Sequence, residues 1–231
     1  MRSMAIGAKE KIIKSKNRVR DQGEVFTQER EVKNILKLTQ ATSNRYWKFL
    51  EPACGDGNFI VEIVRQRLEH IKHDPSYRIP QRREYVIARM LSTIYGVDIA
   101  EDNIADCKKR IWDEIFKFTP KKSSATFLLA VKHILDTNLQ LGDMLNGKDK
   151  VFFVEYDFQG AEYITKAKVK RKVYALTSME VGDNTAVDEL PFTVLSLLEP
   201  IDLVKYHPKP LANVDLLTGQ ATLFNEESEN V

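Results

Sequence analysis

The sequence predicts an α/β fold with a mostly parallel sheet, followed by a small β-rich C-terminal extension. Three observations predict it. Short apolar runs alternate with longer amphipathic segments between residues 28 and 141, which is the pattern of repeated strand–helix–strand units. A glycine turn, "CGDG", separates the first apolar run from the clearest amphipathic segment, as in a βαβ unit. Beyond residue 145 the residues become β-branched and aromatic and then alternate with lysines, which favours strands.

The predicted elements are, in order, a helix over residues 28–40, a strand over 46–50, a helix over 60–71, a helix over 81–92, a strand over 93–99, helices over 103–117 and 124–135, and a strand over 138–141. Thr27 is a suitable cap for the first helix. The helix over 60–71 is the clearest, because its apolar residues recur every three or four positions. Such an alternation predicts helices on both faces of the sheet.

The β-rich extension begins with "VFFVEYDF", which predicts a strand over residues 151–158, and a turn is expected at Gln159 and Gly160. Further strands are predicted over 162–176 and 192–198. We therefore divide the chain into a basic arm (1–20), the main α/β domain (21–158), the β-rich extension (159–212) and a flexible polar tail (213–231).

Composition restricts the class of protein. The chain has 231 residues, of which 43% are hydrophobic and 29% charged, as expected for one main globular domain. No apolar run approaches the roughly 18 residues of a membrane-spanning helix, and the basic N-terminus lacks the apolar core of a signal peptide, so we expect a cytoplasmic protein that does not enter a membrane. Cys54 and Cys107 suit neither a disulfide framework nor paired zinc spacing, and no metal site is predicted. Basic clusters over residues 9–20, 65–89 and 166–172 allow a nucleic-acid partner without requiring one.

The segment "FLEPACGDGNFI" (49–60) is the predicted ligand loop, because ligands of open α/β sheets bind at the carboxyl ends of the strands, where glycines let the backbone approach closely. The dinucleotide fingerprint fails, since its third glycine position holds Ile60 and Asp98 follows Gly55 by far more than about 20 residues. A P-loop fails as well, because no Gly-Lys-Ser/Thr follows. Glu51 and Asp56 crowd the loop with carboxylates, so the expected ligand carries positive charge, such as an ammonium or a sulfonium.

Four segments resemble the motifs of a known family. They are "GEVFT" (23–27), "LEPACGDGNF" (50–59), "YGVDI" (95–99) and "LGDML" (141–145). In this order they resemble the S-adenosylmethionine-binding motifs of DNA adenine methyltransferases, in the N6-adenine group of restriction-modification systems. The resemblance covers roughly residues 20 to 147 and implies a Rossmann-like methyltransferase domain.

The resemblance implies a role for several residues. Glu51 and the backbone of residues 53–57 would hold the methionine part, with residues 23–27 closing over its carboxylate. Asp98 would accept hydrogen bonds from both ribose hydroxyls, Ile99 would pack on the adenine face, and Asp143 would accept a hydrogen bond from the adenine amine. The cofactor-binding residues implied in this way are Gly23, Phe26, Thr27, Glu51, Ala53, Cys54, Gly55, Asp56, Gly57, Asp98, Ile99, Asp143 and Met144. Taken singly, Glu51 also suits a partner of a helix dipole, and Asp143 a turn residue.

The chain departs from the family at the methyl-transfer motif. There the family has Asn/Asp-Pro-Pro-Tyr/Phe, which accepts hydrogen bonds from the target amine and stacks on a flipped base. This chain has no Pro-Pro pair, and the expected place holds Glu155, Tyr156, Asp157 and Phe158. In one interpretation these are the catalytic residues, with a carboxylate accepting from the amine and an aromatic ring stacking on the base. In the other, residues 151–158 form a hairpin strand whose aromatic residues pack across strands, and the chain binds the cofactor without methylating a base.

Two functions are therefore expected from the resemblance. The first is an S-adenosylmethionine-dependent DNA methyltransferase of the adenine N6 type, from a restriction-modification or phage system, with DNA as substrate. The alternative is an S-adenosylmethionine-binding but inactive subunit or regulator, whose partner protein supplies the catalytic motif or target recognition.

Two further segments bear on partners. Lysines at every second position over residues 166–172 suit either phosphate contacts or an edge strand protected against aggregation. The tail segment "GQATLF" (219–224) resembles the peptide by which bacterial replication proteins dock on the sliding clamp, so Gln220–Phe224 is a candidate clamp-binding segment. The alternative is that Leu223 and Phe224 pack on this protein's own core.

Overall fold

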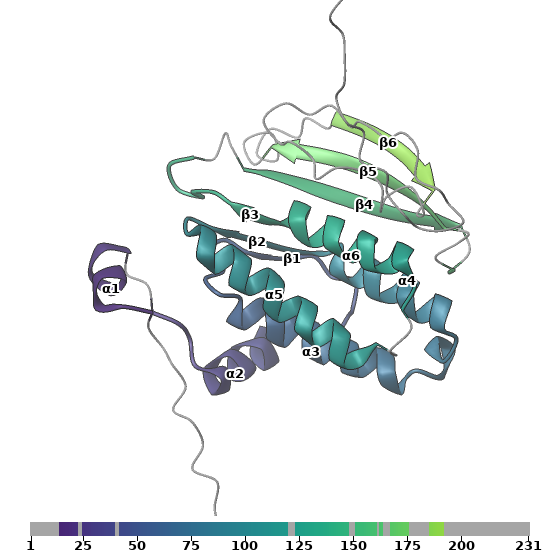
Figure 1. The fold of residues 1–231 in the computed structure, drawn as a ribbon, viewed down its shortest axis with the longest axis horizontal. Helices are drawn as coiled ribbons and strands as arrows, with labels where there is room; N and C mark the ends of the chain where they lie inside the picture. Colours follow the sequence, from purple (N-terminus) through teal and green to yellow (C-terminus); the bar gives the residue numbers. More distant parts are fainter. Residues whose placement is uncertain are drawn as a thin grey trace, which may run out of the picture.

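The computed structural model describes residues 14–22, 25–39, 42–119, 123–147, 151–160, 162–163, 167–175 and 185–191. The elements are α1 (Lys16–Gln22), α2 (Glu29–Thr39), β1 (Phe49–Glu51), α3 (Asn58–His73), the 3-10 turn η1 (Pro75–Tyr77), α4 (Pro80–Leu91), β2 (Ile94–Asp98), α5 (Glu101–Phe118), α6 (Ala125–Asn138), β3 (Leu139–Leu141), β4 (Phe152–Gly160), β5 (Ala167–Ala175) and β6 (Thr185–Pro191) (Figure 1). Gly23, the predicted strand over 192–198 and the segment Gln220–Phe224 lie outside the described residues. No helix within the described ranges is both long and apolar enough to cross a membrane.

The first sheet consists of β1, β2 and β3 in that order, and both pairings are parallel. This confirms the predicted α/β class with a parallel sheet. β1 begins at Phe49 rather than at Tyr46. The reason is a turn before the strand, in which the Tyr46 amide donates to the side chain of Asn44 at 2.9 Å.

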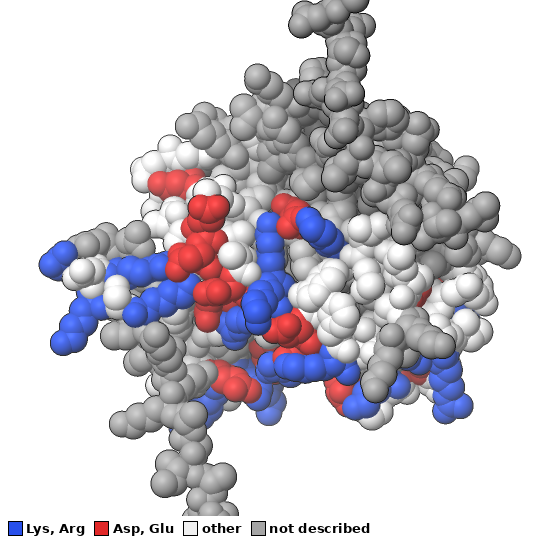
Figure 2. Space-filling view, viewed as in Figure 1, with Lys and Arg blue, Asp and Glu red and all other residues white. Residues whose placement is uncertain are grey.

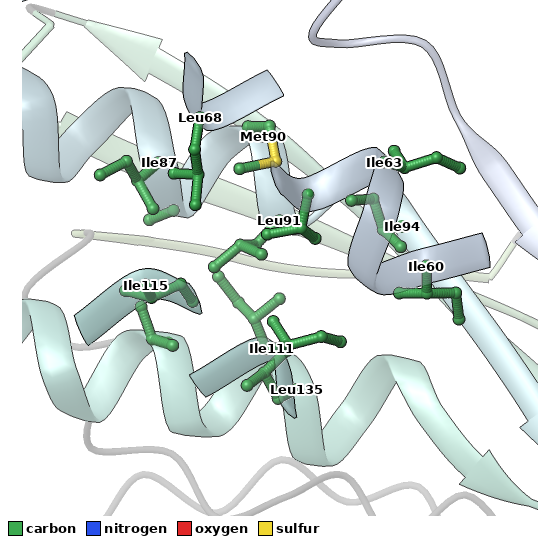
Figure 3. Packing of buried hydrophobic residues seen from close by; sticks show 14 of the residues in the cluster. Ile60, Ile63, Leu68, Ile87, Met90, Leu91, Ile94, Ile111, Ile115 and Leu135 are labelled. Atoms are coloured by element: carbon green, nitrogen blue, oxygen red, sulfur yellow. The ribbon is translucent and has the colours of Figure 1, made fainter. Parts of the chain in front are cut away.

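One face of this sheet is covered by helices. A Cβ added to Gly96 of β2 would lie 2.6 Å from Ile60 of α3, so the glycine lets α3 pack directly on the strand. Figure 3 shows apolar side chains of α3, α4, α5, α6 and β2 meeting in one core. Its labelled members are Ile60, Ile63, Leu68, Ile87, Met90, Leu91, Ile94, Ile111, Ile115 and Leu135. Burying each such side chain contributes about 1.5–3 kcal/mol.

The second sheet is antiparallel, with β5 between β4 and β6. Because β5 is central in this sheet, the edge-strand interpretation of the lysines over 166–172 is wrong. In the register, Lys170 stands opposite Asp157 and Lys172 opposite Glu155. Gln159 and Gly160 also pair with β5, so β4 continues where a turn was predicted.

β4 covers the other face of the parallel sheet. The Tyr95 hydroxyl of β2 donates to the Val154 carbonyl at 2.8 Å, and the side chain of Gln140 in β3 donates to the Phe152 carbonyl. Farther along β4, the ring of Tyr156 meets His133 of α6 edge-on. Contrary to the prediction of helices on both faces, the described residues cover this face with β4: in Figure 1 the β4–β6 sheet lies above β1–β3, and α3 and α5 lie below them. A strand takes that place because alternate residues of β4 are apolar and bury one face against the domain.

Candidate functional site

A cavity of about 530 Å³ lies at the carboxyl ends of β1, β2 and β3. Its walls come from the end of β1 and the loop after it, from Asp98 and Ile99 at the end of β2, from residues 142–146 after β3, and from Val25–Thr27 before α2. The carboxyl ends of parallel strands are the usual place for a ligand in an open α/β sheet. The volume falls within the range of about 300–1,000 Å³ typical of small-molecule sites.

Most of the residues singled out by the resemblance meet in this cavity. Those that line it are Phe26, Thr27, Glu51, Ala53, Cys54, Gly55, Asp56, Asp98, Ile99, Asp143 and Met144. Gly57 does not line it, and Gly23 lies outside the described residues. The structure adds Val25, Pro52, Asn58, Phe59, Gly142, Leu145 and Asn146. Except for Asn146, these added residues lie within the four quoted motifs, so treating each motif as a whole segment would have identified them.

The two glycines of the loop have different tasks. Both have left-handed backbone, with φ of 54° at Gly55 and 92° at Gly57, which L residues rarely adopt. A Cβ on Gly55 would lie 3.0 Å from the ring of Phe26, so this glycine admits a cavity-lining ring. A Cβ on Gly57 would lie only 2.4 Å from the Sγ of Cys107 in α5. Gly57 thus serves the packing of the loop on α5.

Asp98 ties the glycine loop to the end of β2. Its Oδ2 accepts from the Gly55 amide at 2.8 Å, while its Oδ1 accepts from the Ala100 amide at 2.9 Å and from the Asn103 side chain at 3.1 Å. Sequence reasoning missed this positioning role, because no local pattern signals a hydrogen bond between residues so far apart. A carboxylate oxygen can accept two hydrogen bonds, so Oδ2 keeps acceptor capacity beyond the bond to Gly55.

Two further carboxylates are held partly out of water. Burial raises the pKa of Glu51, and a hydrogen bond from the Ala53 amide only partly offsets this. Burial also raises the pKa of Asp56, against the opposing effect of Arg110, whose NH1 lies 2.8 Å from both the Oδ2 and the main-chain oxygen of Asp56. The other oxygen of that carboxylate, Oδ1, is buried and has no hydrogen-bond partner among the described residues. Carboxyl groups whose pKa is shifted by burial and by a charged neighbour are typical of functional sites.

Asp143 organises the turn after β3. Its Oδ1 accepts from the amides of Leu145 at 2.8 Å and Asn146 at 3.0 Å, and its Oδ2 accepts from the side chain of Asn146 at 3.0 Å. The two backbone hydrogen bonds, with the side-chain bond from Asn146, lower the pKa of Asp143. A carboxylate at the cavity wall is therefore kept ionised.

The cavity is acidic. Glu51, Asp56, Asp98 and Asp143 line it, and no lysine, arginine or histidine does so within the described part of the chain. In the same part, no three His, Cys, Asp or Glu side chains are grouped to hold a metal ion. Apolar groups of Phe26, Phe59, Ile99 and Met144 complete the lining. The cavity therefore suits a ligand with cationic or hydrogen-bond-donating groups and a flat apolar part, and it disfavours a phosphate.

Ion pairs attach the N-terminal segment around α1 to the start of α5. Lys14 pairs with Asp102 at 2.9 Å and with Asp106 at 2.7 Å, and Arg18 pairs with Asp102 at 2.6 Å. Figure 2 shows basic side chains at the left of the view meeting a group of acidic ones, at the place where α1 lies near the start of α5 in Figure 1. Nearer the cavity, the side chain of Asn58 donates to the Thr27 carbonyl at 2.9 Å. This last contact holds Thr27 in the cavity wall.

The structure does not bring the candidate catalytic residues to the cavity. Glu155, Tyr156, Asp157 and Phe158 lie on β4 and are absent from its lining. Tyr156 and Phe158 are buried against α6 and α4, and burial raises the pKa of Tyr156 to about 12. Glu155 forms an ion pair with Lys48, and Asp157 is exposed and accepts from Gln159 at 2.9 Å. In local structure, β4 is the hairpin strand of the second interpretation.

Comparison with known protein families and with curated proteins finds no match for this chain. The function is therefore argued from the chemistry of the cavity and from the motifs whose residues line it.

Proposed function

We propose that the cavity binds S-adenosylmethionine, and that the chain is a cytoplasmic methyltransferase of the DNA adenine N6 type with a Rossmann-like domain. The observation that supports this most is the set of four carboxylates at the ends of three parallel strands, without a basic side chain among the described lining residues. Apart from its one carboxylate, the polar groups of S-adenosylmethionine include a sulfonium, an ammonium, two ribose hydroxyls and an adenine amine. All of these are cations or hydrogen-bond donors, which carboxylates favour.

The residues present fit this cofactor. The buried Oδ1 of Asp56 has no hydrogen-bond partner among the described residues, and a buried acceptor costs free energy until a donor reaches it. An ammonium would supply that donor. Asp98 has acceptor capacity left for ribose hydroxyls, while Ile99 and Met144 offer apolar surface to an adenine ring.

The residues of the chain would bind and orient the cofactor, which when bound supplies an electrophilic methyl group. Asp98 holds the Gly55 amide at the end of β2, so ligand contacts on the loop and on the strand keep a fixed relation. Phe26 and Thr27 cover the loop from the side of α2 and reduce access of water to the reacting centre. Such orientation is worth several kcal/mol in a transfer reaction.

A second candidate function is favoured by the position of β4. The residues that would accept from the target amine are absent from the cavity lining, which supports a chain whose described residues supply the proposed cofactor site without the catalytic motif. In this case the chain is a cofactor-binding subunit or regulator, and a partner protein supplies the group that acts on the base.

Calorimetry with S-adenosylmethionine and its demethylated product, S-adenosylhomocysteine, tests the cofactor proposal. We expect both to bind, and we expect Glu51→Gln to weaken binding about tenfold, as for the loss of one charged hydrogen bond. Asp113→Asn is the matched control, because Asp113 is half-exposed on α5, does not line the cavity, and among the described residues forms an ion pair with Lys109 one turn away. Failure of the parent chain to bind either compound would overturn the proposal.

Transfer of a labelled methyl group to unmodified DNA then separates the two functions. Transfer by the chain alone supports the methyltransferase. Binding without transfer, followed by transfer when a partner protein is added, supports the subunit.

A further inference from the structure

A second hollow, of about 350 Å³, lies between α3, α4 and α5. Its floor includes Leu68 of α3, whereas Asn58, at the start of the same helix, lines the first cavity. At a rise of 1.5 Å per residue, these two positions are about 15 Å apart along the helix. The hollow is therefore a separate feature of the surface.

The hollow gathers basic side chains from three helices. They are Arg65 and Lys72 from α3, Arg83 from α4 and Lys117 from α5. Two carboxylates, Glu69 and Glu114, also line it, and Glu62 beside it pairs with Arg65 at 2.6 Å, so four cations meet three carboxylates. The sequence places Arg65, Lys72 and Arg83 in one basic cluster, and the fold adds Lys117.

Most of these cations are held in place by the carboxylates. Glu114 receives two hydrogen bonds from Arg65, at 3.2 and 3.3 Å, and one from Lys117 at 2.9 Å. Lys72 pairs with Glu69 at 2.9 Å. Because these side chains are already ordered, less conformational entropy is lost when an anion binds between them.

Arg83 differs from the other three cations. Its Nε donates to the Tyr77 carbonyl at 2.9 Å, and one amino group donates to the Arg78 carbonyl at 3.3 Å. No carboxylate of the described residues forms an ion pair with Arg83. Neutral acceptors thus hold the guanidinium in place, and no carboxylate of the described residues compensates its charge. A planar guanidinium of this kind suits a phosphate.

The floor of the hollow is apolar. Leu68 is buried, and Phe118 is partly buried and packs against the core. An apolar floor strengthens electrostatic attraction above it, because the local dielectric constant is lower than in water. The ring of Phe118 also offers a surface on which a flat base can stack.

We propose that this hollow binds a nucleotide unit, with its phosphate at Arg83, Lys72 and Lys117 and its base against Phe118. The unit is either a free nucleotide or part of a single strand of nucleic acid, since both present the same phosphate and base. This site is independent of the first cavity, whose acidic lining disfavours phosphate.

Fluorescence anisotropy of a labelled short oligothymidylate, measured with the full chain at low ionic strength, tests the proposal. Arg83→Gln is expected to weaken binding about tenfold, as for the loss of one charged hydrogen bond. Glu69→Gln removes a negative charge from the same rim and is expected to tighten binding. Lys109→Gln is the control, because Lys109 is a highly exposed lysine of α5 that does not line the hollow.

Competition by unlabelled thymidine monophosphate distinguishes the two sources of the ligand. Displacement of the oligonucleotide supports a free nucleotide, and binding that resists displacement supports a strand. Absence of binding by both probes would overturn the proposal, as would equal weakening by Arg83→Gln and Lys109→Gln. If Arg83→Gln fails to fold, as judged by thermal unfolding, Lys72→Gln replaces it, because the side chain of Lys72 is exposed.

Discussion

Replacing Gly57 with alanine would place a methyl group where α5 leaves no room. The added Cβ would lie 2.4 Å from the Sγ and 3.1 Å from the Cβ of Cys107. The backbone φ of 92° is also unfavourable for an L residue. The substitution thus combines backbone strain with overpacking at one position.

The two effects allow an order-of-magnitude expectation. A non-glycine residue in the left-handed region costs about 1–3 kcal/mol, and an extra group in a well-packed core costs about 1–3 kcal/mol. Gly57→Ala is therefore expected to lower the free energy of unfolding by about 2–6 kcal/mol. This is a large share of the roughly 5–15 kcal/mol by which a typical domain is stable.

Urea unfolding followed by circular dichroism measures this loss. A double-mutant cycle with Cys107→Ala separates its parts, because Cys107→Ala removes the Sγ but leaves the backbone strain. We expect the double variant to recover about 1–3 kcal/mol relative to the sum of the single changes. A loss below about 0.5 kcal/mol, the size of an ordinary surface substitution, or an additive cycle would refute the packing of this loop on α5.

Three other predictions follow from single contacts. Burial raises the pKa of Glu51, so its carboxyl group favours the folded state at low pH and this contribution is lost as the pH rises above 4.5. The stability of Glu51→Gln relative to the parent, measured by urea unfolding, should therefore be higher at pH 7 than at about pH 4, and equal differences at the two pH values would contradict this. Asp102→Asn, or NaCl at about 1 M, should speed tryptic cleavage at Arg18, because it weakens the exposed ion pairs that hold α1, each of which contributes below about 1 kcal/mol. An unchanged cleavage rate would show that these ion pairs do not hold α1. Tyr95→Phe should cost about 1–3 kcal/mol in urea unfolding, because the buried Val154 carbonyl loses its donor, and a neutral result would argue against this contact between the sheets.

Local patterns predicted the helices well. The recurrence of apolar residues from Ile60 to Ile71 placed α3 within two residues of its observed ends, since this periodicity directly marks the buried face of a helix. The short strands were harder, because three residues such as Phe49–Glu51 carry almost no periodic signal. Within the site, the motifs identified most of the lining of the cavity, because each lies where a strand or helix meets a loop.

The contacts between distant segments were beyond the sequence. Asp98 and Gly55 are typical of a ligand loop and a strand end, but their mutual hydrogen bond depends on how β1 and β2 pair. The same holds for Arg83, which lies near Lys117 only because α4 and α5 both pack on α3. No spacing along the chain predicts the hydrogen bond between Asp98 and Gly55 or the proximity of Arg83 to Lys117.

The sequence by itself determined the order of α-helices and strands from α2 to β5, the acidic glycine loop and the motifs that line one cavity. Only the tertiary structure decided that β4 lies across the parallel sheet instead of leaving that face to helices, and that Glu155 to Phe158 are thereby kept out of the cavity lining. The physical reason is that an alternating apolar pattern states which face of a strand must be buried. It does not determine which surface will bury that face, and for β4 this surface is formed by Tyr95, Gln140 and His133, which lie on three different elements.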